Sequence, residues 1–188
     1  MKSKAVAAWL VVVVACSLIA RFDDGWLASY LSLQPRKVMH GEVWRLVTWP
    51  AIELGLISGF FTVRWIYSLG DDLAVAWGNA RLFRYLLAIT LAGGTAYVLA
   101  AAATGDATLW RCGGGATMSA LAIAWSRVRP DNTLTYFRSI ALRGLGVVAA
   151  MVGFAVVDAL LRGPVEALPE LVACALAIVW PHRNGMVS

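Results

Sequence analysis

A short apolar segment that begins directly after three glycines constrains the fold of this chain most. It starts in the stretch Arg111-Cys-Gly-Gly-Gly-Ala-Thr-Met-Ser-Ala-Leu121 and ends near Trp125, about 13 residues after Gly113. A helix needs roughly 20 apolar residues to cross the hydrocarbon of a bilayer, so this one must begin below the membrane surface, inside protein. Gly113 and Gly114 let neighbouring backbones approach its first turn, where unpaired N–H groups and the positive end of the helix dipole lie. The sequence therefore predicts a buried helix start, with these glycines as candidate binding positions.

The composition places the whole chain in a membrane. Of its 188 residues, 60% are hydrophobic and 14% are charged, whereas soluble domains average about 25% charged residues. The net charge of +5 comes from basic residues spread over short loops, which argues against a nucleic-acid partner and fits contact with anionic lipid heads. The cysteines and histidines show no metal-ligand spacing, so neither a metal nor a cofactor is expected. We predict one integral membrane domain over residues 1–188, with membrane lipids as partners.

Six apolar segments follow one another and predict an all-α bundle of six transmembrane helices. They cover residues 5–20, 49–69, 83–103, 113–125, 140–161 and 168–181. The first could also be a cleaved signal peptide, but a retained helix is favoured because the rest of the chain is membrane-embedded. Gly70-Asp-Asp72 is expected to end the second segment. The polar and aromatic stretch 21–48 is expected to lie at the membrane interface as the first loop.

Basic residues predict the orientation of this bundle. Six spans put both ends of the chain on one side, and the loops of that side carry nine basic residues against six on the other. The positive-inside rule then places the N-terminus in the cytoplasm and the loop 21–48 outside. A chain this short, without a soluble domain, is compatible with a bacterial inner (plasma) membrane, which is the location we expect.

The stretch Gly41-Glu-Val-Trp-Arg-Leu-Val-Thr48 resembles the G-x-x-W-R-L-x-T stretch in the first loop of rhomboid intramembrane proteases. Further matching residues follow without a gap: Gly55-Leu56, Phe61, Gly70, Trp77-Gly78, Arg81, Phe83, Tyr85 and Gly93-Gly94. The glycine-led segment and Pro130-Asp131 also stand where that family has theirs. The resemblance covers roughly residues 5–180 and implies a rhomboid-like bundle with a short, buried fourth helix and an interfacial first loop.

The resemblance also implies where catalytic groups should stand, and this chain lacks them. Active members open the fourth helix with G-x-S-G, whose serine is the nucleophile, and a histidine on the sixth helix is its base. Here Gly115 replaces the serine and the histidine position falls near Leu168, in a segment that contains no histidine up to Trp180. The histidine and asparagine that help to hold the oxyanion fall on Ser58 and Thr62. The resemblance therefore implies a pseudoprotease rather than a serine-type endopeptidase.

Four polar or aromatic residues remain as candidates outside the glycines. Trp44 and Arg45 are candidate binding residues, although an interfacial anchor and a lipid-phosphate contact are equally favoured for them. Ser58 and Thr62 are spaced i, i+4 and share one helix face. They could line what is left of a cavity, but packing and bonding to their own helix is the favoured interpretation.

Glu53, Arg64 and Asp158 are ionisable residues within the predicted spans, which makes each a functional candidate by default. Glu53 and Arg64 are 11 residues apart, about 16 Å in depth, and so cannot pair with each other. A structural role is at least as well supported for Arg64 and Asp158. The expected partners are Arg45 or Arg111 for Glu53, Asp71 and Asp72 for Arg64, and Arg162 for Asp158.

Two functions from different classes fit these features. The favoured one is non-catalytic binding or scaffolding of transmembrane client proteins, held between the second and fifth spans. The alternative is an active intramembrane serine protease with Ser119 as a displaced nucleophile. Ser119 lies four residues past Gly115, about 6 Å deeper, where the sequence offers no base. A transporter lacks support because the polar residues form no continuous row and no internal repeat is visible.

Overall fold

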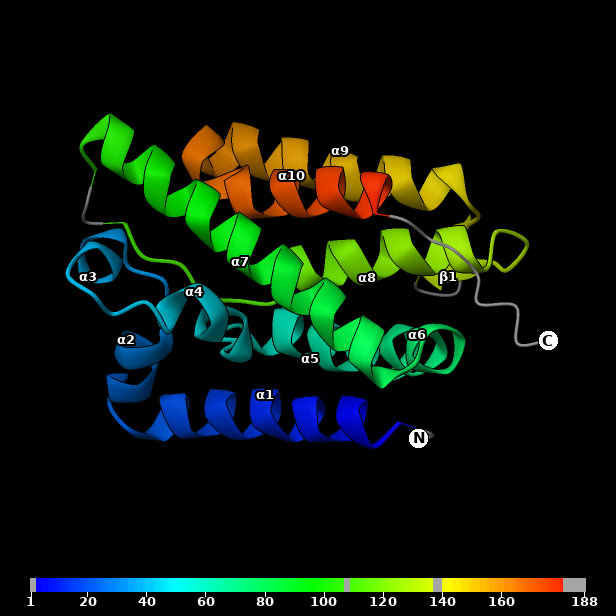
Figure 1. Cartoon of the computed structure of the whole chain (residues 1–188), viewed down its shortest axis with the longest axis horizontal. Helices are drawn as coiled ribbons and strands as arrows, with labels where there is room; N and C mark the ends of the chain where they lie inside the picture. The colour runs from blue at the N-terminus through cyan, green and yellow to red at the C-terminus, as the bar shows by residue number, and fades with distance from the viewer. Residues whose placement is uncertain (1–2, 107–108, 137–139, 181–188) are drawn as a thin grey trace.

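The computed structural model describes residues 3–106, 109–136 and 140–180, in which most long helices run roughly along one direction (Figure 1). In chain order the helices are α1 (Lys4–Phe22), α2 (Trp26–Leu31), α3 (Pro35–Met39), α4 (Arg45–Thr48), the 3-10 helix η1 (Trp49–Ala51), α5 (Leu56–Trp65), the π-helix η2 (Ile66–Gly70), α6 (Asp71–Trp77), α7 (Asn79–Thr104), α8 (Gly115–Val128), α9 (Leu145–Arg162) and α10 (Pro164–Val179). Strands β1 (Leu134–Tyr136) and β2 (Ile140–Leu142) form one antiparallel hairpin.

Three of the described helices are long and apolar enough to cross a membrane: α1, α7 and α9. A fourth candidate is the pair formed by Arg45–Ala51 and Leu56–Trp77, which is bent by 100°. Helices α8 and α10 are shorter, with 14 and 16 residues. The predicted all-helical membrane fold is therefore confirmed, apart from the small hairpin. By length and composition the described helices give three or four candidate spans, not six.

Helix α8 lies at the centre of the bundle. Ala116, Ala120, Leu121 and Ile123 are fully buried, and they point to different sides of the helix. A helix that is apolar all round must be surrounded by other helices, and α5, α7, α9 and α10 all pack on it. The hydroxyl of Tyr85 on α7 donates to the backbone oxygen of Ala120 at 2.7 Å. The short glycine-led segment is thus buried, as its length predicts.

Two adjacent glycines bring α7 against its neighbours. A Cβ on Gly93 would lie 3.3 Å from the Cα and backbone oxygen of Pro169 in α10, and one on Gly94 would lie 3.3 Å from the backbone oxygen of Leu46 in α4. Both distances are tighter than ordinary Cβ contacts. Gly93 and Gly94 therefore allow close packing of α7 against α10 and α4.

The first loop folds into the short helices α2, α3 and α4 and anchors the segment before α8. Leu33 and Arg111 exchange two backbone hydrogen bonds, at 2.8 and 2.9 Å. The guanidinium of Arg45 donates to the backbone oxygens of Ser29 and Ser32, both at 2.7 Å, and pairs with Glu42 at 2.6 Å. These bonds fix the chain at the point where Arg111 enters the bundle.

Two expected boundaries of the second segment are wrong. Its helix begins at Leu56, after the η1 turn and a non-helical stretch over residues 52–55. It also continues through Gly70 into α6. The acidic residues there are satisfied within the fold: Asp71 accepts from the N–H of Ser3 at 2.8 Å, and Asp72 accepts from the indole of Trp125 at 3.0 Å.

The fifth and sixth segments also differ from their predicted ranges. Residues 140–142 pair with β1, so α9 begins only at Leu145. Helix α10 begins at Pro164, because proline is well suited to a first helical position, and it runs on through Pro169. The earlier start brings Glu166 into α10, together with Glu170, which the predicted range 168–181 already contains.

Candidate functional site

The chain turns sharply before α8 at two positions, 113 and 114, where a side chain would strain the backbone or meet a neighbouring atom. Gly113 has φ +115°, which strongly favours glycine, and its N–H donates to the backbone oxygen of Trp49 at 3.1 Å. A Cβ on Gly114 would lie 2.8 Å from Cγ2 of Thr62. The tight approach of α5 to the start of α8 thus requires glycine at position 114.

A carboxylate fills the anion position at this helix start. Glu53 lies in the stretch between η1 and α5, and its Oε1 accepts from the N–H of Gly114 at 2.5 Å and from the hydroxyl of Thr62 at 2.7 Å. Its Oε2 accepts from the hydroxyl of Ser58 at 2.9 Å. An anion at a helix N-terminus is stabilised by the unpaired N–H groups and the dipole. The expected pairing of Glu53 with Arg45 or Arg111 is therefore wrong, since its partners are Gly114, Ser58 and Thr62.

A second carboxylate faces Gly115. A Cβ on Gly115 would lie 2.8 Å from Oε1 of Glu170 in α10, so the missing side chain at position 115 leaves the space that this carboxylate uses. The residue of α10 that faces Gly115 is thus Glu170. Glu170 lies two residues after Leu168, the position near which the rhomboid resemblance places the catalytic histidine, and that placement stays a prediction.

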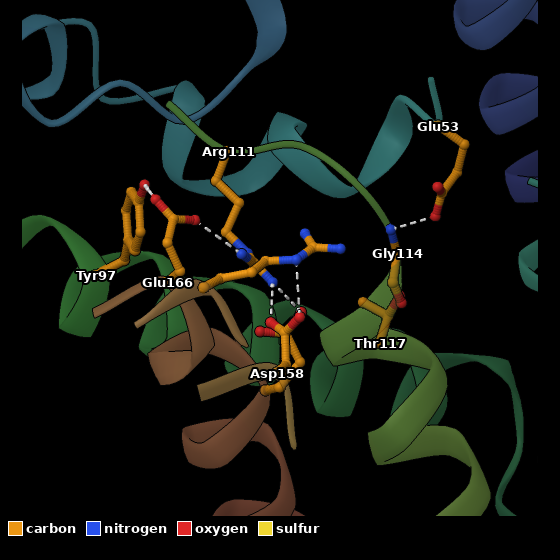
Figure 2. A network of polar contacts seen from close by, with 9 residues as sticks. Glu53, Tyr97, Arg111, Gly114, Thr117, Asp158 and Glu166 are labelled. Carbon is orange, nitrogen blue, oxygen red and sulfur yellow. Dashed lines mark hydrogen bonds and ion pairs between the residues drawn. The ribbon is translucent and has the colours of Figure 1, made fainter. Parts of the chain in front are cut away.

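Glu170 belongs to a network centred on Arg111. Figure 2 shows Arg111 in this network with Asp158, Glu166 and Tyr97. The guanidinium of Arg111 pairs with Glu170 at 2.6 Å, with Glu166 at 3.0 Å and with Asp158 at 3.6 Å. Arg162 pairs with the other oxygen of Asp158 at 3.0 Å, as the i, i+4 spacing predicts. Only 9% of the Arg111 side chain is exposed, whereas 66% of Arg162 is. The hydroxyl of Tyr97 on α7 completes the network by donating to Glu166 at 3.0 Å.

A cavity of about 340 Å³ joins these two carboxylate groups. It lies between α5, α8, α9 and α10, and its apolar walls come from Trp65, Met118, Met151, Phe154 and Ala155. Its polar lining comes from Glu53, Ser58, Arg111, Ser119, Asp158, Arg162 and Glu170. Phe154 is 60% exposed, so the cavity edge on α9 is reached from outside the bundle.

Arg111 and Cys112, in the loop before α8, line this cavity, and burial and nearby carboxylates shift their pKa values. Burial raises the pKa of the Cys112 thiol to about 11, and the charge of Glu53 adds to the shift. The thiol is therefore protonated near neutral pH and a poor nucleophile. Burial by itself lowers the pKa of Arg111, but the neighbouring carboxylates, Glu170 first, outweigh it and the pKa is raised. Arg111 is therefore a fixed positive charge.

No histidine is among the described residues that line the cavity. His40 lies at the end of α3 in the first loop, where its Nδ1 is 2.6 Å from the backbone oxygen of Arg36. His182 lies outside the described residues. Ser119 lines the cavity and is buried, and its hydroxyl contacts the thiol of Cys174. The structure thus brings Gly115, Ser119 and Ser58 to one cavity together with carboxylates, without a described imidazole.

The structure places the other predicted site residues away from the cavity. Arg45 is 1% exposed and holds the first loop together, so its guanidinium does not reach lipid phosphates. Trp44 is 39% exposed, and its ring lies 5.6 Å from that of Tyr30. Arg64 is exposed near the end of α5, and its reach toward Asp71 and Asp72 stays a prediction.

Glu166 and Glu170 are the functional candidates that the sequence reasoning missed. The available signal was their i, i+4 spacing directly after Pro164, together with an arginine just before the glycines. Charges of opposite sign in two segments predicted to be buried are expected to form an ion pair, because an unpaired charge in an apolar interior is costly. The spacing alone does not say which segments meet.

A family model described as "eukaryotic integral membrane protein (DUF1751)" matches residues 4–180. No curated protein matches the chain. The match supports the prediction of an integral membrane protein over nearly the whole length. It also corrects the expected location: because the family is described as eukaryotic, a bacterial inner membrane is wrong.

Proposed function

This chain belongs to the family of eukaryotic integral membrane proteins (DUF1751), and we propose that it is a non-catalytic, rhomboid-like member that binds transmembrane segments of other proteins. The proposed binding place is the cleft between α5 and α9, at the cavity that both helices line. The proposal takes the six spans to be α1, the α5–α6 helix, α7, α8, α9 and α10. Support for that order comes from the short, buried α8 and its glycine start.

One observation carries the proposal: carboxylates contact the positions that the rhomboid resemblance assigns to the nucleophile (Gly115) and to the oxyanion donors (Ser58 and Thr62). Glu53 uses the N–H of Gly114 and the hydroxyls of Ser58 and Thr62, which could otherwise stabilise a negative oxygen. Glu170 lies against Gly115. Catalysis of acyl transfer depends on donors aimed at the developing oxyanion, and a fixed negative charge there opposes it. The cavity that Glu53 and Glu170 line is nevertheless open, with a volume of about 340 Å³.

The cavity is suited to receive side chains from one neighbouring helix. Its volume of about 340 Å³ is too small for a whole helix, and its edge carries the exposed Phe154. Association of helices in a bilayer is driven by close packing and by polar contacts, since lipid tails already solvate apolar surface. A client segment lying along α5 and α9 gains both, because Met151 and Ala155 offer an apolar wall next to charged groups.

Site-specific photocrosslinking tests this proposal. A photoreactive phenylalanine analogue replaces Phe154 in the full chain, and the control carries it at Leu99 of α7, which is 65% exposed and is not a cavity residue. We expect discrete protein adducts from position 154 only, mapped by mass spectrometry to transmembrane segments. Equal adduct patterns from both positions, or lipid adducts alone, would contradict binding in the cleft.

A further inference from the structure

The network beside the cavity carries more negative than positive charge. Three carboxylates, on Asp158, Glu166 and Glu170, face two guanidiniums, on Arg111 and Arg162. The imbalance is larger in the buried part, because Arg162 is 66% exposed and screened by its surroundings. Glu53 adds a further carboxylate to the lining. A cavity with excess negative charge between membrane helices favours an occupant with positive charge.

Individual atoms of the network also lack partners. Among the described residues, Oε2 of Glu170, Oδ2 of Asp158 and Nε of Arg111 are buried without a hydrogen bond. The Asp158 oxygen is only at ion-pair range of Arg111, 3.6 Å away. Arg111 lines the cavity with 91% of its side chain buried, since 9% is exposed. Buried polar atoms are usually paired in native proteins, so two oxygens without donors point to a missing donor.

We propose that the transmembrane segment held in the cleft presents a lysine or arginine whose charged nitrogen enters the cavity and pairs with Glu170 and Asp158. This inference rests on the proposed function. The depth fits: Asp158 lies four residues before the end of α9, and Glu170 six residues after the start of α10. At 1.5 Å per residue these are about 6 and 9 Å from the helix ends, within reach of a basic side chain in the terminal turns of a client helix.

The same charges set the selectivity of the site. A segment with a neutral residue at that depth leaves the carboxylate oxygens unpaired, whereas a lysine supplies three N–H donors and cancels the excess charge. A segment with an acidic residue adds repulsion and is excluded. The cavity thus distinguishes clients by one residue rather than by overall hydrophobicity.

Proteoliposomes of neutral lipid provide the test. The full chain with the photoreactive residue at position 154 is reconstituted with single-span Leu/Ala reporter peptides that carry lysine, glutamine or glutamate two turns from one end. We expect about tenfold more adduct with the lysine reporter than with the glutamine reporter, which corresponds to ~1.4 kcal/mol. Equal adduct with lysine and glutamine would overturn the inference while leaving cleft binding intact. No adduct above the Leu99 control with any reporter would overturn both.

Charge variants of the protein sharpen the result. Asp158→Asn removes a proposed partner and should reduce the lysine preference. Arg162→Gln frees Asp158 and should increase the preference; because Arg162 is exposed, this variant should fold even if the first does not. Arg84→Gln makes the same charge change at an exposed site near the start of α7 and should leave the preference unchanged. A lysine preference that Arg162→Gln fails to raise, or that Arg84→Gln shifts equally, would contradict pairing in the cavity.

Discussion

The Arg111 side chain should be the charged group whose loss destabilises the bundle most. It is 9% exposed and lies 2.6 and 3.0 Å from the carboxylates of Glu170 and Glu166. Removing one partner of a buried ion pair costs about 3–5 kcal/mol, because the remaining charge stays buried and uncompensated. We expect Arg111→Gln to lose this amount of unfolding free energy. The backbone bridge between residues 111 and Leu33 is kept, so the loss reports on the side chain.

Arg162→Gln is the matched control for this experiment. Arg162 also pairs with a carboxylate of the network, at 3.0 Å from Asp158, but it is 66% exposed. Exposed ion pairs contribute about 0–1 kcal/mol, so this variant should stay close to the parent chain. The assay is equilibrium unfolding of the full chain in mixed micelles, followed by tryptophan fluorescence against the mole fraction of a denaturing detergent.

A compensating variant tests whether charge is the cause. In Arg111→Gln combined with Glu166→Gln and Glu170→Gln, no uncompensated carboxylate remains on α10, and we expect most of the lost stability to return. Interaction energies of this kind show as non-additive effects in such cycles. Two results would refute the view that Arg111 is the counter-charge of the network. One is an Arg111→Gln loss of unfolding free energy no larger than that of Arg162→Gln. The other is a loss that adding Glu166→Gln and Glu170→Gln fails to recover.

Three further outcomes follow from the site. Gly114→Ala should destabilise the bundle by about 1–3 kcal/mol through overpacking. Adding Thr62→Ser should recover most of the lost unfolding free energy, because it removes the Cγ2 that the new Cβ would meet. No recovery would contradict that contact. A fluorophosphonate probe should label the chain no more than its Ser119→Ala variant, and labelling that this substitution abolishes would instead favour the protease. Alkylation of Cys112, measured by mass spectrometry, should rise about tenfold per pH unit from pH 8 to 10, because only the thiolate reacts and burial raises its pKa to about 11; a plateau near pH 9 would contradict the raised pKa.

The buried position of α8 could be predicted because length and hydrophobicity are properties of a single segment. A run of about 13 apolar residues cannot cross a bilayer unaided, and adjacent glycines indicate close packing wherever they meet another backbone. The ion pair of Asp158 with Arg162 was also predictable, since both residues lie on one helix face.

The network around Arg111 could not be predicted because its partners lie 47 to 59 positions away in the sequence. Which of several buried carboxylates meets an arginine depends on helix depth and rotation, and an error of a few residues in a helix start changes both. The predicted sixth segment began at residue 168, four residues after the true start at Pro164. Glu166 was therefore left outside the predicted helix, although it lies in the first turn of α10.

The second segment was misjudged for a related reason. Gly70 followed by two aspartates is a typical helix break in isolation, but here each acidic side chain finds a donor from another helix or from the N-terminus of α1. Tertiary hydrogen bonds thus override a local signal, and the helix continues to Trp77. Glu53 shows the same effect: its expected place near the outer surface suggested Arg45 or Arg111 as its partner, while the fold offers it a helix N-terminus.

The two glutamates at the start of α8 make the proposed loss of catalysis hard to reverse. A serine placed at position 115 would bring its Cβ within 2.8 Å of Glu170, whose carboxylate is held by Arg111, so the hydroxyl would enter a space already in use. Moving that carboxylate would leave a buried arginine with one fewer partner, at a cost in stability. The N–H of Gly114 and the hydroxyl of Thr62 would still be bound to Glu53. The absence of a side chain at position 115 and the ion-pair network beside it are therefore coupled features, and this coupling favours the proposed binding function over hydrolysis.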